Sequence, residues 1–388
     1  MVHITLFALH ALFVFLVGSS LVTADLTVLN RRRSLHASAF RDLFSDTSLK
    51  KSDVQSAPQS AVKTTYNLTS GSLIAWQNQQ PAQAGNTESV VIITHGVDRN
   101  AKTYFNILNS AYNQAHSSGL SRAPDNTLRI APLFYDAKAD KAAIQTGGLA
   151  WGANNAWCIA EGSVRPKNRT SISSLTVYDE LVQMYSNRTA FPNVKTITFV
   201  GHGCGAMLTQ RYAALGKDLV NNVSIRYVVG NPSSMLYFTS DRPSKTFKPS
   251  SCPAYNNFFY GLEDYYIPYD RRTTSNSDLF KSYAQRDVRY LVSLNDNGGG
   301  DQTCEARAAG GKARKDRTLA YWKYIHLLAG ESASSYQDFK GTFPNITSDG
   351  NDAFHGASIS HQLSQLSGVG HDASSVINSK QGRQAIFG

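Results

Sequence analysis

The sequence predicts an α/β fold in which a mostly parallel central sheet carries helices on both faces. Three observations predict it. Short runs of β-branched residues alternate with amphipathic stretches from about residue 63 to the end. The segment TITFVGHGCGAMLTQRYAALG, residues 196–216, is typical of a strand, a tight turn and a helix. No internal repeat interrupts this alternation, so we expect one domain over residues 63–388.

Each element follows from a local pattern. SLIAWQNQ and SVVIITHG indicate strands, and AKTYFNILNSAYNQAHSSG indicates a helix because its apolar residues recur at helical spacing. TLRIAPLFYD, TITFV, SIRYVVGN and VRYLVSLND indicate further strands. SISSLTVYDELVQMYSN and KDRTLAYWKYIHLLAG indicate helices, the second closed by Gly330. HQLSQLSG is a short strand before a C-terminal helix that ends in GRQAIFG.

The first residues predict export. LFALHALFVFLVG is an apolar run too short to span a bilayer comfortably, and Val22 and Ala24 supply the small residues of a cleavage site. We therefore expect residues 1–24 to be a signal peptide and the protein to be secreted. Residues 25–62 are polar and aperiodic, which indicates a flexible leader or pro-segment. No later run predicts an integral membrane segment.

Surface and composition features restrict the partners. Five N-x-[ST] sequons predict glycosylated surface loops, at Asn67, Asn168, Asn187, Asn222 and Asn345. The net charge of +10 comes mostly from scattered Lys and Arg without interleaved aromatic residues, so we expect no nucleic-acid partner. The Cys and His spacing matches no zinc site, and no glycine-rich nucleotide motif follows a strand, so no metal or cofactor is expected.

The turn at residues 201–205 has the shape of the G-x-S-x-G nucleophile elbow, but its central residue is Gly203. Gly201 and Gly205 fill the positions two before and two after the centre, where the tight turn needs small residues. The helix that follows directs its free N–H groups at the site, which suits an oxyanion.

Three further pieces fall where a hydrolase with this elbow needs them. Asp296 ends the strand VRYLVSLND, where a carboxylate can orient a His, and His371 lies in the Gly-rich turn GVGHDASS. The loop after VVIITHG supplies an oxyanion N–H around Val97 or Asp98, and Cys204 supplies the other.

These motifs together resemble a poorly characterised secreted microbial branch of the α/β-hydrolase superfamily, whose members are esterase- or lipase-like. The matching stretches are HGVDRNAKTYF, GHGCGAMLTQRYA, CPAYNNFFYGL, TCEARAAGG and GVGHDASS. The resemblance covers about residue 88 to the end. It implies an α/β-hydrolase fold, Asp296 and His371 as acid and base, and a Ser at position 203, where this chain has Gly.

The missing Ser leaves alternatives for function. Removing a triad Ser costs about a millionfold in turnover, so we favour a degenerate hydrolase that binds a small ester-like ligand or a protein partner. A one-residue slip of the turn would instead make Cys204 the nucleophile of an active ester or amide hydrolase with His371 and Asp296. A water held by His371 and Asp296 is a third, weaker candidate.

Four cysteines allow three disulfide connectivities. Cys252 and Cys304 lie in two of the motifs that carry the family resemblance, so the resemblance pairs them with each other. Cys158 and Cys204 then remain, and we predict that they form the second disulfide; the alternative is two free buried cysteines, which are uncommon in an oxidising compartment. A Cys158–Cys204 bridge would occupy the only candidate thiol at the elbow.

Overall fold

A computed structural model describes residues 61–78, 85–270, 274–346 and 349–388. The chain divides into two units, Met1–Asp46 and Thr47–Gly388, and all described residues belong to the second. The predicted signal peptide and all but the last two residues of the predicted leader therefore lie outside the described residues. The first strand begins at Val62, one residue before the predicted start of the domain.

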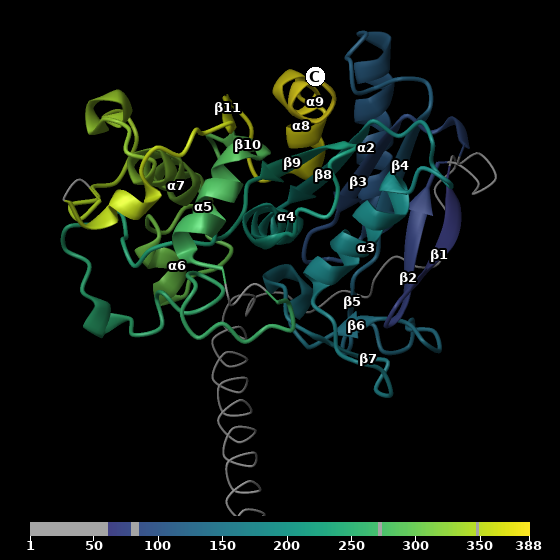
Figure 1. Cartoon of the computed structure of the whole chain (residues 1–388), viewed down its shortest axis with the longest axis horizontal. Helices are drawn as coiled ribbons and strands as arrows, with labels where there is room; N and C mark the ends of the chain where they lie inside the picture. The colour runs from purple at the N-terminus through teal and green to yellow at the C-terminus, as the bar shows by residue number, and fades with distance from the viewer. Residues whose placement is uncertain (1–60, 79–84, 271–273, 347–348) are drawn as a thin grey trace, which may run out of the picture. The chain divides into compact units, whose positions relative to one another are not determined.

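An eight-stranded sheet forms the centre of this unit, in the order β1-β2-β4-β3-β8-β9-β10-β11 (Figure 1). β1 pairs antiparallel with β2, and β2 pairs antiparallel with β4, whereas all other neighbours are parallel. The strands are β1 Val62–Leu68, β2 Gly71–Gln77, β3 Ser89–Thr94, β4 Thr127–Pro132, β8 Thr196–His202, β9 Ser224–Gly230, β10 Asp287–Ser293 and β11 Gln362–Leu366. The predicted mostly parallel sheet is confirmed.

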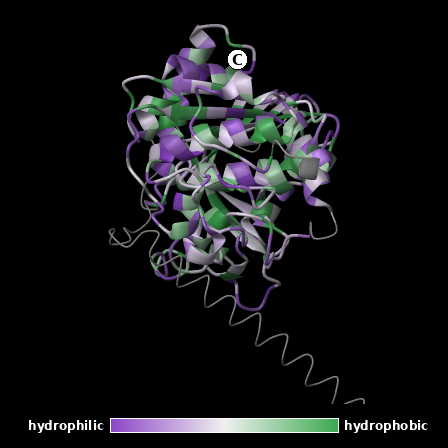
Figure 2. Cartoon of the chain, turned by 90° about the vertical axis from the view of Figure 1, so that its left-hand side faces the viewer, coloured by the Kyte–Doolittle hydropathy of each residue, from purple (hydrophilic) through white to green (hydrophobic). Residues whose placement is uncertain are grey.

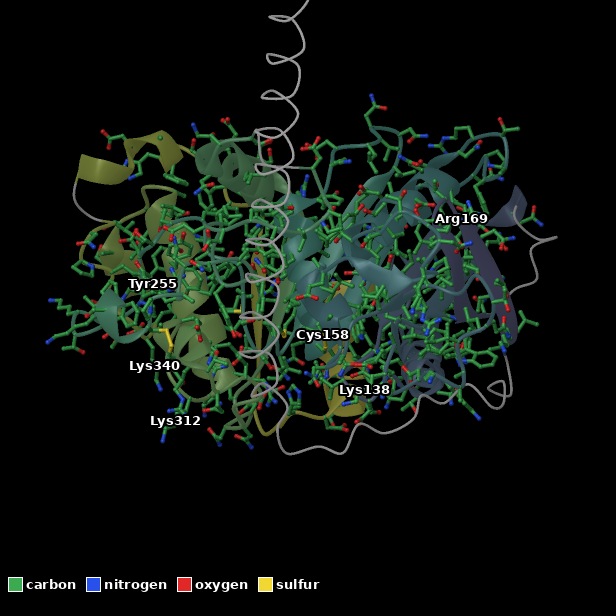
Figure 3. The ribbon with its side chains drawn as sticks, turned by 90° about the horizontal axis from the view of Figure 1, so that it is seen from below. Lys138, Cys158, Arg169, Tyr255, Lys312 and Lys340 are labelled. Atoms are coloured by element: carbon green, nitrogen blue, oxygen red, sulfur yellow. A yellow bond between two sulfur atoms is a disulfide. The ribbon has the colours of Figure 1, made fainter. Side chains whose placement is uncertain are left out.

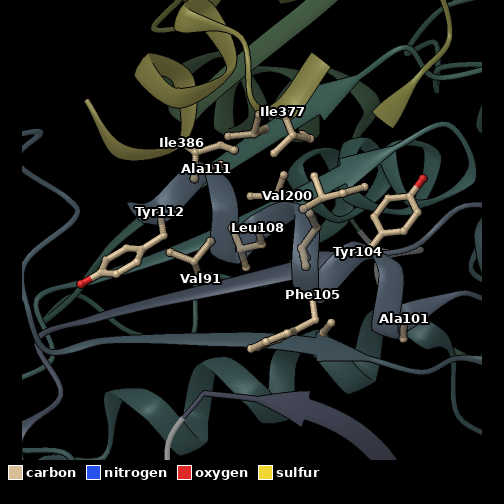
Figure 4. Close-up of a cluster of buried hydrophobic side chains, with 14 of the residues drawn as sticks. Val91, Ala101, Tyr104, Phe105, Leu108, Ala111, Tyr112, Val200, Ile377 and Ile386 are labelled. Atoms are coloured by element: carbon tan, nitrogen blue, oxygen red, sulfur yellow. The ribbon is translucent and has the colours of Figure 1, made fainter. Parts of the chain in front are cut away.

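Helices cover both faces of the sheet, and β8 illustrates the alternation between them. Val200 lies in the core cluster that includes residues of α2 Ala101–Ser117, α8 Ala373–Ile377 and α9 Lys380–Phe387 (Figure 4). The neighbouring Phe199 instead contacts Tyr178 of α3 Ser174–Ser186 and Tyr212 of α4 Cys204–Leu215. Successive strand residues point to opposite faces, so the two helical layers lie on opposite sides of the sheet.

Burial explains why the inner strands are so apolar. Every residue of β3 is buried, as are six of the seven residues of β8. A parallel strand with helices on both faces has no solvent side, so it needs apolar residues at successive positions. Figure 2 shows the same division, with hydrophobic residues gathered along the sheet and hydrophilic residues on the outer helices and loops.

Several elements were not predicted. A small sheet of β5 Tyr135–Asp136, β6 Ala150–Trp151 and β7 Ser163–Arg165 has the order β5-β6-β7. The predicted strand TLRIAPLFYD is thus divided between β4 and β5. β1 was not predicted either, nor were η2 Ala156–Ile159, η3 Pro249–Ser251, α5 Asn276–Gln285, α6 Cys304–Ala308, η4 Ala333–Tyr336 and η5 Asp349–Phe354. The predicted helix KDRTLAYWKYIHLLAG is α7 Arg314–Leu328.

No helix among residues 61–78, 85–270, 274–346 and 349–388 combines the length and the apolar character that a membrane span requires.

Candidate functional site

The elbow lies between β8 and α4, and its register is the unslipped one. Gly203 has φ +58° and ψ −114°, and the helix begins at the next residue, Cys204. A Cβ added to Gly201 would lie 2.2 Å from the Gly205 carbonyl oxygen, and one added to Gly205 would lie 2.3 Å from the Thr94 oxygen. These distances are too short for any side chain, which is why the turn needs glycine on both sides of its centre.

Gly203 differs from these two glycines because a Cβ at its position would meet no backbone atom and only the side chain of His371, which would have to shift by a few tenths of an ångström. A Cβ built on Gly203 would lie 3.3 Å from Nε2 of His371 and 3.6 Å from its Cε1. The side chain of residue 203 would therefore face the imidazole. The backbone has the geometry of an elbow, but the position that holds an attacking group in that motif carries only hydrogen.

Asp296 and His371 form a hydrogen-bonded pair at the carboxyl ends of neighbouring strands. Asp296 follows β10 and His371 follows β11, and Nδ1 of His371 lies 2.7 Å from Oδ2 of Asp296. The aspartate side chain is 1% exposed and the imidazole is 32% exposed. The two predicted residues are therefore brought together, with the carboxylate buried behind the ring and Nε2 directed towards position 203.

Arg314, in the first turn of α7, is a partner of Asp296 that the sequence interpretation missed. Its Nη1 donates to Oδ1 of Asp296 at 3.0 Å, and its Nε donates to the Ser233 hydroxyl at 3.2 Å. Burial favours a higher pKa for Asp296, but the His371 hydrogen bond and the positive charge of Arg314 outweigh it and hold the pKa below its usual value. Asp296 is therefore ionised at neutral pH.

The loop after β3 carries the predicted oxyanion N–H groups, and His95 shapes it. Nε2 of His95 accepts a hydrogen bond from the Phe134 N–H at 3.0 Å, so Nδ1 carries the proton and donates to the Gly96 oxygen at 2.9 Å. Burial lowers the pKa of His95 to about 3, which keeps the ring neutral. Among the described residues, the Val97 N–H has no hydrogen-bond acceptor.

Both predicted cysteine pairs form disulfides. The Cα atoms of Cys158 and Cys204 are 5.4 Å apart, and both side chains are buried. Cys158 is labelled in Figure 3. Cys204 therefore contributes a backbone N–H to the elbow and no thiol. The Cα atoms of Cys252 and Cys304 are 5.8 Å apart. Cys252, Cys304 and Glu305 form the only cluster of His, Cys, Asp or Glu side chains in the described part of the chain that is close enough to bind one metal ion. The two sulfurs are bonded to each other in the disulfide.

His202 lies beside the site but has the surroundings of a packing residue. It is 3% exposed, its ring centroid is 4.5 Å from that of His371, and its Nδ1 lies 3.4 Å from the Tyr104 hydroxyl. Burial first, and then the neighbouring His371, lower its pKa well below the usual value, so the ring is neutral.

The five sequon asparagines are all exposed, namely Asn67, Asn168, Asn187, Asn222 and Asn345. Asn187 and Asn222 lie near each other, because Asn222 Nδ2 donates to the Ser186 oxygen at 3.0 Å. These two precede β8 and β9, at the end of the sheet opposite to the elbow.

Comparisons with known proteins identify the fold. No protein-family model matches the sequence, and no curated protein matches it. The structure is similar to poly(aspartic acid) hydrolase-1 from Sphingomonas sp. KT-1, with a TM-score of 0.50 and 16% identity over 84% of this chain and 98% of that one. It is also similar to a poly(3-hydroxybutyrate) depolymerase from Bordetella parapertussis, with a TM-score of 0.51 and 14% identity over 87% of this chain and 90% of that one. At such identities the likeness concerns the fold, which is an α/β-hydrolase fold.

Proposed function

We propose that this chain is a secreted glycoprotein of the α/β-hydrolase fold that binds an ester-like ligand or a protein partner without serine-dependent turnover. One observation carries the proposal. Gly203 occupies the centre of a well-formed elbow, and His371 Nε2 lies 3.3 Å from the point where a Cβ of residue 203 would be. The general base, its acid partner and the tight turn are in register, and only the nucleophile is missing.

The chemistry of the acid–His pair explains why turnover should be lost. At position 203 His371 has no side-chain O–H or S–H group to deprotonate, so only a water, the weaker candidate, is left for it to activate. Loss of a triad Ser costs about a millionfold in turnover, although an oxyanion hole alone retains roughly a thousandfold over water. The site would therefore still bind a carbonyl group, while its covalent chemistry is absent.

The alternative, an active ester or amide hydrolase with Cys204 as nucleophile, has two observations against it. The Cys204 sulfur is bonded to Cys158, and the turn is centred on Gly203. A disulfide sulfur has no thiolate with which to attack a carbonyl. The alternative is therefore retained as an outcome of the experiment below and not as a second proposal.

Secretion and glycosylation are parts of the same proposal. Support comes from two disulfides, which persist in oxidising compartments, and from five exposed sequon asparagines. The N-terminal apolar run supplies the expected export signal. Mass spectrometry of the protein released into the medium, before and after deglycosylation, would measure both the mature N-terminus and the occupied asparagines.

Gly203→Ser tests the central claim. We expect wild type to ignore a fluorophosphonate probe and to cleave short-chain p-nitrophenyl esters no faster than His371→Ala. Gly203→Ser should become labelled and gain esterase activity that His371→Ala removes, because the base and its acid are already placed. The esterase activity of Gly203→Ser should exceed that of wild type by at least about a hundredfold. This figure already allows for the roughly hundredfold loss that a serine misplaced by an ångström would cause.

Gly203→Ala is the matched control, because it adds the same Cβ at the same positive φ without a hydroxyl. It should remain unlabelled and inactive. Wild-type esterase activity that depends on His371 and is abolished by Cys204→Ala would contradict the proposal and identify Cys204 as the nucleophile.

A further inference from the structure

We infer that the segment Asn155–Cys158, here called the brace, holds both N–H donors of a carbonyl-binding site in place, with Arg99 and Asn155 as its positioning residues. The brace comprises the N-cap and the first three residues of η2. The inference rests on the proposed function, because it concerns the same site. It specifies how the ligand is bound: a carbonyl oxygen of the ligand accepts hydrogen bonds from N–H groups of the loop after β3 and of the start of α4.

Arg99 fixes the two peptide groups of the loop after β3. Its backbone N–H donates to the Gly96 oxygen at 3.2 Å, and its Nη1 donates to the Val97 oxygen at 2.6 Å. In a trans peptide the N–H points away from the C=O. The two bonds therefore set the directions of the Val97 and Asp98 N–H groups, which are the candidate oxyanion donors of this loop.

Arg99 is buried and is held in turn by the brace. Its side chain has no exposed surface, its φ is +53°, and its Nε pairs with Asp140 at 2.8 Å. Nη1 also donates to Oδ1 of Asn155 at 2.9 Å. A buried guanidinium that lost one acceptor would be left with an unpaired donor, so its position depends on each of them.

Asn155 is fixed on three sides. Its N–H donates to Oδ2 of Asp136 at 2.9 Å, and its Oδ1 also accepts from the Trp157 indole N–H at 3.3 Å. The amide Nδ2 is buried without a hydrogen-bond partner among the described residues. The side chain therefore acts through its oxygen, whose two donors are Arg99 and Trp157.

The other end of the brace holds the second donor. Cys158 lies three residues after Asn155 and is bonded to Cys204, the first residue of α4. The first N–H of a helix has no acceptor within the helix, so that of Cys204 is available to a ligand oxygen. The brace thus contacts the loop after β3 through Arg99 and the start of α4 through the disulfide. It thereby fixes the distance between the N–H donors of that loop and the Cys204 N–H.

Asn155→Ala and Asn154→Ala form a matched pair that tests this role. Both residues are asparagines with positive φ, at +59° and +64°, so Ala imposes similar backbone strain at each. Only Asn155 contacts Arg99. In the Gly203→Ser background, Asn155→Ala should lower kcat for a p-nitrophenyl ester by about ten- to a hundredfold with little change in KM, because oxyanion donors act mainly in the transition state. Asn154→Ala should stay within about threefold.

Hydrogen exchange followed by mass spectrometry supplies a readout that needs no activity. In otherwise wild-type protein, Asn155→Ala should increase exchange in the peptide containing residues 95–100, and Asn154→Ala should leave it unchanged. Equal exchange in the two variants, or equal kcat in an active Gly203→Ser background, would overturn the inference. An inactive Gly203→Ser protein in which the exchange difference persists would count against the proposed function while leaving the brace supported.

Discussion

Asp296 illustrates how a single buried carboxylate organises the candidate site. Its two oxygens are divided between two partners, with Oδ2 facing His371 at 2.7 Å and Oδ1 facing Arg314 at 3.0 Å. The carboxylate can orient the imidazole only while it is ionised. Arg314 compensates for part of the cost of burying that charge, so it keeps the acid in the state that the His needs.

Arg314→Gln should raise the pKa of Asp296, because it removes a positive charge from a buried carboxylate. The folded-state pKa of Asp296 is lowered, so its contribution to stability is present above the unfolded pKa and is lost as pH falls through the folded pKa. The variant should therefore destabilise the protein at pH 7 more than at pH 3. Carboxyl carbon NMR titration and urea denaturation measure the two effects.

Arg307→Gln is the control for this prediction, because Arg307 is exposed and lies outside the site. It should leave the titration of Asp296 unchanged. An Asp296 pKa that is the same in Arg314→Gln as in wild type would mean that the arginine does not maintain the ionised acid.

The sequence could predict Gly203, Asp296 and His371 but not Arg314, and the reason is physical. Each of the first three lies at or just after the end of a strand, and parallel strands bring their carboxyl ends to one edge. Arg314 reaches Asp296 from the first turn of α7, 18 residues further along the chain. Nothing local distinguishes it from the neighbouring Lys and Arg, because its partner is set by how α7 packs.

At the scale of elements, the two disulfides close loops of nearly the same length, with sequence separations of 46 and 52 residues. The chain-entropy model therefore gives each a similar stabilisation of about 4 kcal/mol. Their positions differ, because Cys158–Cys204 connects η2 to the start of α4, whereas Cys252–Cys304 connects the region of η3 to α6. Removal of either disulfide should therefore lower the free energy of unfolding by a similar amount, but only removal of Cys158–Cys204 should alter the candidate site.

We expect the double variants Cys158→Ala/Cys204→Ala and Cys252→Ala/Cys304→Ala each to lose on the order of 4 kcal/mol in free energy of unfolding. Only the first should increase exchange in the peptide containing residues 203–207, because only that disulfide holds the start of α4. Urea denaturation and hydrogen exchange measure the two quantities. An equal increase in exchange at residues 203–207 in both variants would contradict a local role for Cys158–Cys204.

The long helices could be predicted and the short elements could not. α2, α3 and α7 follow their predicted stretches, because each is long enough to show a helical pattern or a capping signal. β5 and β6 have two residues each, too few for any period to be visible. α5 did carry a signal, since Ser275 caps it by accepting from the Asp278 N–H, the S-x-x-D pattern of a helix start.

At the scale of the whole molecule, three buried imidazoles make the fold sensitive to acid. Burial lowers the pKa of His95 to about 3 and that of His361 to about 4, and it lowers the pKa of His202 well below the usual value. In the unfolded chain these groups bind protons near pH 6.5. The unfolded state therefore gains protons between pH 6.5 and 4.5 that the folded state does not. The free energy of unfolding consequently decreases as the pH is lowered through this range.

Buried carboxyl groups oppose this trend without cancelling it. Burial raises the pKa of Asp179 to about 6 and also raises that of Asp301, so the folded state gains protons there before the unfolded state does. Because three imidazoles outnumber two carboxyl groups, the free energy of unfolding still decreases as the pH is lowered, by on the order of 1–3 kcal/mol per pH unit.

Urea midpoints measured between pH 7 and 4.5 test this prediction. They should fall with pH in wild type and fall less steeply in His361→Gln. His116→Gln, at an exposed position, should leave the slope unchanged. Midpoints that stay constant or rise as pH is lowered would show that the buried imidazoles do not determine acid stability.

The mostly parallel sheet with helices on both faces could be predicted from alternation alone, because each strand–helix repeat adds one parallel strand, but the strand order could not. The antiparallel pairing of β1 and β2 could not be predicted either, since no strand is predicted over Val62–Leu68 and the direction of β1 is set by the two-residue turn at Thr69 and Ser70. The contact between Arg99 and Asn155 at the other end of the brace was beyond sequence reasoning, although the Cys158–Cys204 bridge was not. It depends on left-handed backbone at Asn155 and on a buried pair between Arg99 and Asp140, 41 residues apart.

The pairing of the cysteines also bears on how the chain is made. The first cysteine pairs with the second and the third with the fourth, so the two closed loops follow one another along the chain without overlap. Of the three possible pairings of four cysteines, this is the one in which each partner is the next to emerge during synthesis. In a chain threaded N-terminus first into an oxidising lumen, the first bridge can close before Cys252 has emerged, and neither bridge requires a wrong pairing to be undone.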